Sequence, residues 1–173
     1  MRKRAPLKNI NPRDIFHHAD KFLGTDEFLR SKVKGDLLPM VLHPSMVMSA
    51  FASELYFKTI HCIDSGLVPP EHDLRSLYNS LPPMRRQLIK ALWDENIAKN
   101  TELLDNHDKA QGQKIPRDLD SALRDCNRAF EQMRYSYEDP TSIKFYIIDL
   151  PRILRSAILE IQPTWKKPPR KVR

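Results

Sequence analysis

The sequence predicts an all-α protein folded as a helical bundle. Apolar residues recur at three- and four-residue steps through most of the 173 residues, which is the period of an amphipathic helix. Gly and Pro stand at the ends of these stretches, where helices start and stop. No useful length of chain alternates apolar and polar residues as a strand does. For the apolar run 143–148 alone, the periodicity does not decide between helix and strand.

Two long helices and a short one are predicted in the first half of the chain. The first runs from Asn11-Pro12, a cap and a first-turn proline, to Gly24. The second is buried along much of its length and runs from Pro44-Ser45 to Gly66. A short helix is expected over 73–81.

The second half predicts three further helices. A long one opens at Pro82-Pro83, because proline fits the first turn of a helix. The polar range 100–116, which contains Gly and Pro, is a predicted loop. The clearest apolar stripe of the chain lies over 118–137, and the last helix ends where Pro163 stops it.

The formal net charge of +7 is concentrated at the two ends of the chain. Nine of the 29 Lys and Arg residues lie in 1–10 and 163–173, which contain no acidic residue, so the middle has 20 basic against 22 acidic residues. We expect one helical domain over 11–162 between a basic N-terminal tail and a basic, Pro-rich C-terminal tail. Such tails bind a polyanion by counterion release or serve only as solubilising ends, and the sequence leaves both open.

Composition also bears on redox state, membranes and metals. Cys62 and Cys126 each fall on an apolar helix face, which indicates buried thiols in a reducing cytoplasm. No window reaches the ~18 uninterrupted apolar residues that a membrane span requires, so no membrane association is expected. The pairs His17-His18 and His61-Cys62 lack the spacing of a tetrahedral zinc site. No metal and no cofactor are expected, and the four glycines form no phosphate-binding loop.

Three short motifs between Pro44 and Ile161 resemble the HEPN family. They are Ala52 to Lys58 (ASELYFK), His72-Asp73-Leu74, and a late Arg134-Tyr135. The resemblance implies an up-and-down bundle of four or five helices that is frequently dimeric. It also implies work on RNA or nucleotides, often in toxin or defence systems, with some members acting only as binding modules.

The ribonuclease signature of this family is an Arg followed four to six residues later by a His. In the matching region the chain has Arg128 and Arg134 but no histidine. The spacing does occur at Arg13 and His18, outside the region of resemblance. The resemblance therefore implies a family member without the catalytic signature in its usual place.

Several polar residues have both a structural and a functional interpretation. Glu54 borders the apolar stripe and must be partnered if buried, so an ion pair with Arg128 or Arg134 is favoured over ligand contact. Asp73 is placed to cap the short helix, which leaves His72 to close a turn. Tyr137 continues the apolar stripe, whereas Tyr135 is the freer ring for stacking on a base or contacting phosphate.

Two functions follow from these residues. The first is a HEPN-like module, expected to be a homodimer, that binds RNA, a nucleotide or a partner protein without an intact catalytic motif. Its contact residues are the following: Glu54, Lys58, His72, Arg128, Arg134 and Tyr135. The alternative is a metal-independent ribonuclease in which His72 is a displaced acid or base. A histidine close to Arg128 or Arg134 in an open cleft favours the enzyme.

Overall fold

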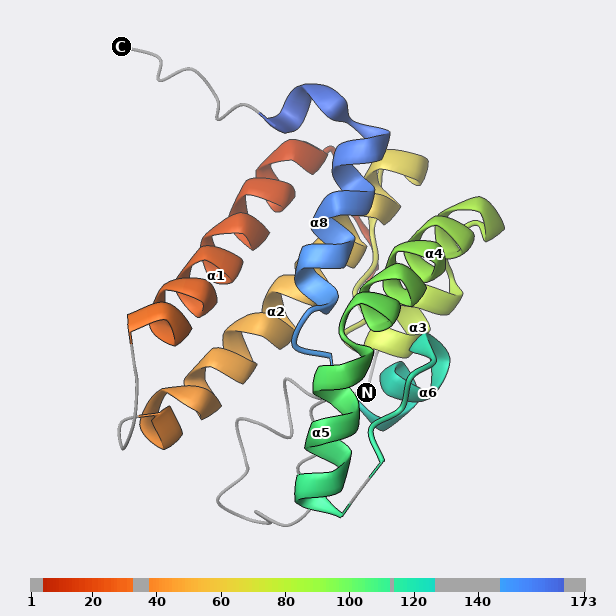
Figure 1. Ribbon diagram of the computed structural model, residues 1–173. Helices are drawn as coiled ribbons and strands as arrows, with labels where there is room; N and C mark the ends of the chain where they lie inside the picture. The colour runs from red at the N-terminus through yellow and green to blue at the C-terminus, as the bar shows by residue number, and fades with distance from the viewer. Residues whose placement is uncertain (1–4, 33–37, 113, 127–146, 167–173) are drawn as a thin grey trace.

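The computed structural model describes residues 5–32, 38–112, 114–126 and 147–166, and these confirm the all-α helical bundle. Helix α1 (Pro12–Lys32) and helix α2 (Leu38–Ser65) form a long antiparallel hairpin. Helix α8 (Leu150–Ile161) lies between α1 and α4 (Pro83–Lys99), and the long helices run up and down in turn (Figure 1). The remaining helices are α3 (Leu74–Asn79), α5 (Thr101–Gln111), α6 (Leu119–Asp125) and a 3₁₀ helix η3 (Pro163–Lys166).

The core is formed mainly by α2, α8 and the inward face of α1. Its largest fully buried side chains are the following: Phe16, Tyr56, Phe57, Ile60, Leu77, Ile89, Leu119, Leu123, Ile147, Leu150 and Leu154. Both predicted cysteines are buried thiols, and Cys62 Sγ donates to the carbonyl of Ile10 over 3.3 Å. Burial raises the pKa of Cys62, which keeps this thiol protonated and unreactive at neutral pH.

Several predicted boundaries are confirmed. Helix α3 begins after Asp73, whose carboxylate accepts the backbone N–H of Ser76 over 2.7 Å as an N-cap. Helix α4 begins at Pro83, and α8 ends two residues before Pro163. Gly66 follows the end of α2 with a φ of 69°, a conformation that favours glycine.

The first two helices are longer than predicted, since α1 runs past Gly24 and α2 begins before Pro44. Helix α1 continues past Gly24, and Asp26 beyond it is fully buried and accepts from the Ser45 hydroxyl of α2. Helix α2 begins at Leu38 and contains Pro44 in its interior. The contact between Asp26 and Ser45 joins α1 to α2 beyond Gly24, where local propensity alone predicts the end of α1.

Helix α5 occupies most of the range predicted to be a loop. The helix is held by its acidic residues: Arg117 bonds to Asp105 over 2.9 Å and to Asp108 over 2.7 Å, and Asp108 accepts the Ile115 backbone N–H. Gly112 then ends the helix in the left-handed conformation. These contacts join polar residues that are 7 to 12 positions apart in sequence, so the pattern of apolar residues does not indicate them.

Two short strands were not predicted. Strand β1 (Leu7–Lys8) pairs antiparallel with β2 (Leu67–Val68), which follows α2 directly. Part of the predicted N-terminal tail is therefore paired with the helical domain. Two residues are too few for an alternating pattern to be visible in sequence.

Two sequence predictions fall partly outside the described residues. Helix α6 begins after Asp118, which caps it, but the stripe predicted over 118–137 continues into 127–146. The apolar run 143–148 also lies mostly in that range. Its described end, at Ile147 and Ile148, is not helical and leads into α8.

Candidate functional site

Glu54 is a buried carboxylate in the middle of α2. The helix passes through the bundle there, with Ser53 and Phe57 fully buried beside it, and Glu54 is 2% exposed. A carboxylate in this position must be paired, because desolvating an isolated charge costs several kcal/mol. Glu54 is expected to have charged or hydrogen-bonding partners at this position.

Lys58 and His72 are those partners. Lys58 lies one turn later on α2, is 8% exposed, and donates from Nζ to Glu54 Oε1 over 2.8 Å. His72 Nδ1 lies 2.9 Å from the same oxygen and donates to it, since an ionised carboxylate only accepts. Two of the motifs that resemble HEPN sequences thus meet in space at one oxygen atom.

The turn before α3 fixes the position of His72. Glu71 Oε1 accepts the backbone N–H groups of His72 and Asp73 over 3.0 and 3.1 Å, and Asp73 caps α3. These bonds hold the backbone so that the imidazole reaches back to α2. The predicted cap at Asp73 is confirmed, and His72 has a further contact, with Glu54, that the sequence did not reveal.

The cluster combines a buried carboxylate with an exposed imidazole. The side chain of His72 is 68% exposed, so its second ring nitrogen is open to a ligand while Nδ1 is held by Glu54. Glu54 Oε2 is buried and has no hydrogen-bond partner among the described residues. A histidine oriented in this way binds phosphate or hydroxyl groups and, near neutral pH, accepts or donates a proton.

The other predicted contact residues lie elsewhere in the chain. Arg128, Arg134 and Tyr135 lie outside the described residues, as does Tyr137, so the predicted pairing of Glu54 with either arginine is not seen within the described part. In the first helix, Arg13 Nε lies 3.3 Å from His17 Nε2, and the ring of His18 packs edge-on against Phe22. His18 is exposed on α1 apart from this ring contact.

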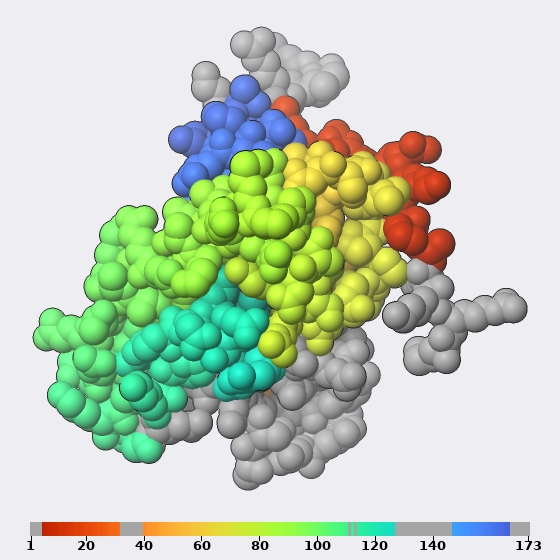
Figure 2. All heavy atoms as spheres, turned by 90° about the vertical axis from the view of Figure 1, so that its right-hand side faces the viewer, coloured from red at the N-terminus to blue at the C-terminus, as the bar shows by residue number. Residues whose placement is uncertain are grey.

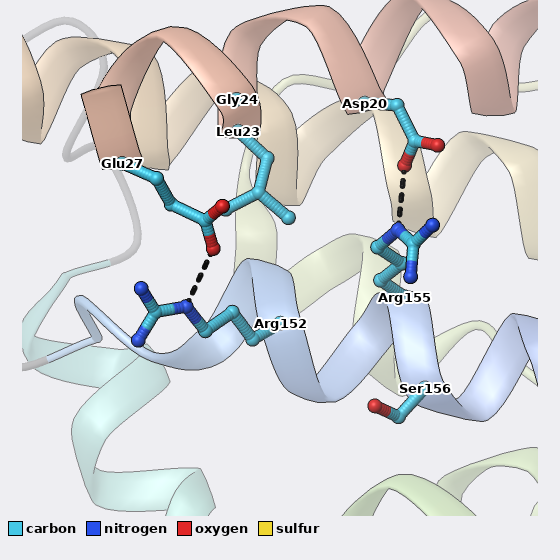
Figure 3. A pocket seen from close by; sticks show the side chains of 7 residues that line it. All are labelled: Asp20, Leu23, Gly24, Glu27, Arg152, Arg155 and Ser156. Carbon is cyan, nitrogen blue, oxygen red and sulfur yellow. Dashed lines mark hydrogen bonds and ion pairs between the residues drawn. The ribbon is translucent and has the colours of Figure 1, made fainter.

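A polar groove between α1 and α8 was missed by the sequence analysis. It has a volume of about 350 Å³ and is lined by the following residues (Figure 3): Asp20, Leu23, Gly24, Glu27, Arg152, Arg155 and Ser156. Arg155 Nε donates to Asp20 over 2.9 Å, and Arg152 Nε donates to Glu27 over 2.7 Å. Each arginine of α8 is therefore held by a carboxylate of α1.

The hydroxyl of Tyr56 completes this network from the core. It donates to Asp20 over 2.5 Å, and burial together with the Asp20 carboxylate raises the pKa of Tyr56 far above its ordinary value. Burial lowers the pKa of Arg155, but the hydrogen bond and charge of Asp20 outweigh this and raise it. The network joins α1, α2 and α8 with fixed charges that balance, which is the arrangement of a structural clamp.

No group of three His, Cys, Asp or Glu side chains in the described ranges is arranged to hold a metal ion. None of the helices described is both long enough and apolar enough to cross a membrane.

Comparison with known proteins gave no match. No family model matches the chain, and neither the curated proteins nor the solved structures contain a significant relative. The geometry of the chain's own residues therefore carries the functional argument.

Proposed function

We propose that this chain is a HEPN-like helical module that binds RNA through His72 and Lys58, with Glu54 as the positioning residue. One observation carries the proposal: the buried Glu54 carboxylate holds Lys58 and the exposed His72 by hydrogen bonds to a single oxygen. The residues concerned belong to the ASELYFK and His-Asp-Leu motifs on which the resemblance rests. The two motifs are joined by a contact in three dimensions, which supports a shared role.

The energetics of the cluster favour a functional role over a purely structural one. A buried ion pair adds little net stability, because apolar residues of similar volume replace such pairs at no cost or with a gain. Glu54 Oε2 has no hydrogen-bond partner in the described part of the chain, and a buried oxygen left in that state adds a further cost of about 1–3 kcal/mol. A cluster with these costs is expected where a ligand uses it, and a cation beside an exposed imidazole suits an RNA phosphate and its ribose hydroxyl.

The binding test compares the wild type with His72→Ala, using a short fluorescein-labelled single-stranded RNA and fluorescence anisotropy. Loss of one hydrogen bond to a charged group costs about 1.5–3 kcal/mol, so His72→Ala is expected to weaken binding by roughly ten- to a hundredfold. His107→Ala, at an exposed histidine of α5, is the matched control and is expected to bind as the wild type. Equal affinity of a folded His72→Ala protein contradicts the proposal.

The proposed module is a homodimer, as the HEPN resemblance implies. Light scattering coupled to gel filtration measures the mass directly. A mass equal to that of one 20.3 kDa chain at all concentrations contradicts this part of the proposal.

A metal-independent ribonuclease is the second candidate, and the bond between Glu54 and His72 favours it. Glu54 fixes Nδ1 of the ring, so the other nitrogen is free to take the proton of a ribose 2′-hydroxyl. That oxygen then attacks the adjacent phosphorus, the bond to the 5′-oxygen breaks, and the leaving oxygen takes a proton. The products are a 2′,3′-cyclic phosphate and a 5′-hydroxyl end.

Incubation of mixed RNA with the protein in chelator separates the two candidates. The enzyme predicts cleavage by the wild type that His72→Ala abolishes, with cyclic phosphate ends. Absence of cleavage together with His72-dependent binding supports the binding module. Cleavage that survives the substitution excludes His72 as the acid or base and points to another histidine such as His18.

A further inference from the structure

Arg86 differs from the other arginines of the described ranges. Seven of them contact an Asp or Glu carboxylate: Arg30, Arg75, Arg85, Arg117, Arg124, Arg152 and Arg155. Within the same ranges, the guanidinium of Arg86 has no hydrogen bond or ion pair, and its Nε is buried without a partner. Burying part of a guanidinium without an acceptor is costly, and no acceptor for Arg86 Nε lies among the described residues.

Arg86 lines a groove at the start of α4. The groove has a volume of about 250 Å³ and is formed by the following residues: Tyr78, Pro83, Arg86, Gln87 and Lys90. Tyr78 comes from α3, and the side of the molecule on which α3, α4 and α6 meet faces the viewer in Figure 2. The side chains of Arg86, Gln87 and Lys90 all supply hydrogen-bond donors, whereas the hydroxyl of Tyr78 already donates to the backbone carbonyl of Arg86 over 3.3 Å.

The charges around the groove leave one positive charge unbalanced. Lys90 is paired with Asp94 over 2.5 Å, and Arg75 of α3 is paired with Asp120. The neighbouring Arg85 is bound to Asp64 by Nε and by Nη2, over 2.9 to 3.2 Å. Arg86 therefore supplies the excess charge of this surface.

We infer that the groove is an anion site in which Arg86 and Lys90 bind a phosphate group. A guanidinium binds phosphate through two parallel hydrogen bonds, and this geometry distinguishes it from the point charge of a lysine. Donors from three side chains around one groove, those of Arg86, Gln87 and Lys90, match the several oxygens of a phosphate better than the two oxygens of a carboxylate. The site is separate from the Glu54 cluster, and the inference does not rest on the proposed RNA contact of His72.

The experiment titrates inorganic phosphate into the full chain by isothermal calorimetry at constant ionic strength. The wild type is expected to bind phosphate saturably, and Arg86→Gln is expected to bind it at least tenfold more weakly. Arg75→Gln removes a paired arginine from the neighbouring helix and is expected to leave the affinity unchanged. Saturable binding of equal affinity in Arg86→Gln, or no saturable binding by the wild type, overturns the site.

Two further arms identify the chemistry. Acetate is expected to bind at least tenfold more weakly than phosphate, and equal affinities overturn the phosphate assignment. Ribose 5-phosphate distinguishes the two sources of the phosphate group. Tighter binding of ribose 5-phosphate than of inorganic phosphate indicates a phosphate carried on a sugar, and equal affinity indicates the free ion. Either result supports the site. If Arg86→Gln fails to fold, Arg86→Lys replaces it, and affinity equal to the wild type in that variant contradicts the bidentate role.

Discussion

Replacing Lys58 with Met is predicted to destabilise the fold strongly. Lys58 is 8% exposed, and its ammonium lies 2.8 Å from the carboxylate of Glu54, which is 2% exposed. Met preserves the length of the side chain but removes its charge, so that among the described residues His72 alone still donates to Glu54. Removing one partner of a buried pair costs about 3–5 kcal/mol, because the other charge stays buried without compensation.

The matched control is Lys99→Met. Lys99 and Glu95 also form a Glu–Lys pair one helical turn apart, at 2.6 Å, but their side chains are 70% and 58% exposed. Solvent screens an exposed helical pair, so the control is expected to change stability far less than Lys58→Met does. The two pairs share sequence spacing and differ in burial, which isolates burial as the cause of the difference.

Urea unfolding followed by circular dichroism measures both variants, and a double-mutant cycle completes the test. Glu54→Leu combined with Lys58→Met removes both charges, so the double variant is expected to be more stable than Lys58→Met alone. A loss in Lys58→Met equal to that in Lys99→Met refutes the argument. A double variant that loses as much stability as Glu54→Leu and Lys58→Met lose together also refutes the argument.

Two other predictions concern α1 and the clamp at Asp20. The hydroxyl of Tyr56 is buried against Asp20, and burial followed by that hydrogen bond raises its pKa above the unfolded value of about 10. The tyrosine of the unfolded chain therefore ionises first as the pH rises, and the free energy of unfolding falls above about pH 10. Tyr56→Phe should reduce this alkaline loss of stability, measured by urea unfolding at several pH values. An equal loss in wild type and variant contradicts the prediction. Gly24 lies inside α1, and a Cβ there meets no atom within 4 Å, so Gly24→Ala should stabilise by up to about 1 kcal/mol. Thermal unfolding should shift upward by about 2–4 °C, and a lower midpoint shows that the glycine is required there.

The sequence predicted those elements whose cause is local. The cap at Asp73, the start of α4 at Pro83 and the end of α2 before Gly66 each depend on a residue within a few positions of the helix end. The misplaced ends have a different cause. Helix α1 passes Gly24 because Asp26 is buried against Ser45 of the next helix, and periodicity contains no information on that contact.

The candidate site was predicted in part for the same reason. Glu54, Lys58 and His72 were identified from their motifs, and the position of Glu54 at the border of the apolar stripe indicated that it must be partnered if buried, as it is. The identity of its partners did not follow, because the hydrogen bond to His72 spans 18 residues of sequence. The clamp of Asp20, Tyr56 and Arg155 was not predicted at all, because it joins three helices over separations of up to 135 residues.

Binding of RNA through the imidazole of His72 can be observed at that ring directly. In a ¹H–¹³C NMR titration of the labelled protein with short single-stranded RNA, we expect the Hε1–Cε1 resonance of His72 to shift saturably. That of His107, exposed on α5, should stay in place. Assignment by the two His→Ala variants identifies each peak. A His72 resonance that does not move while the RNA binds elsewhere on the protein contradicts the central claim.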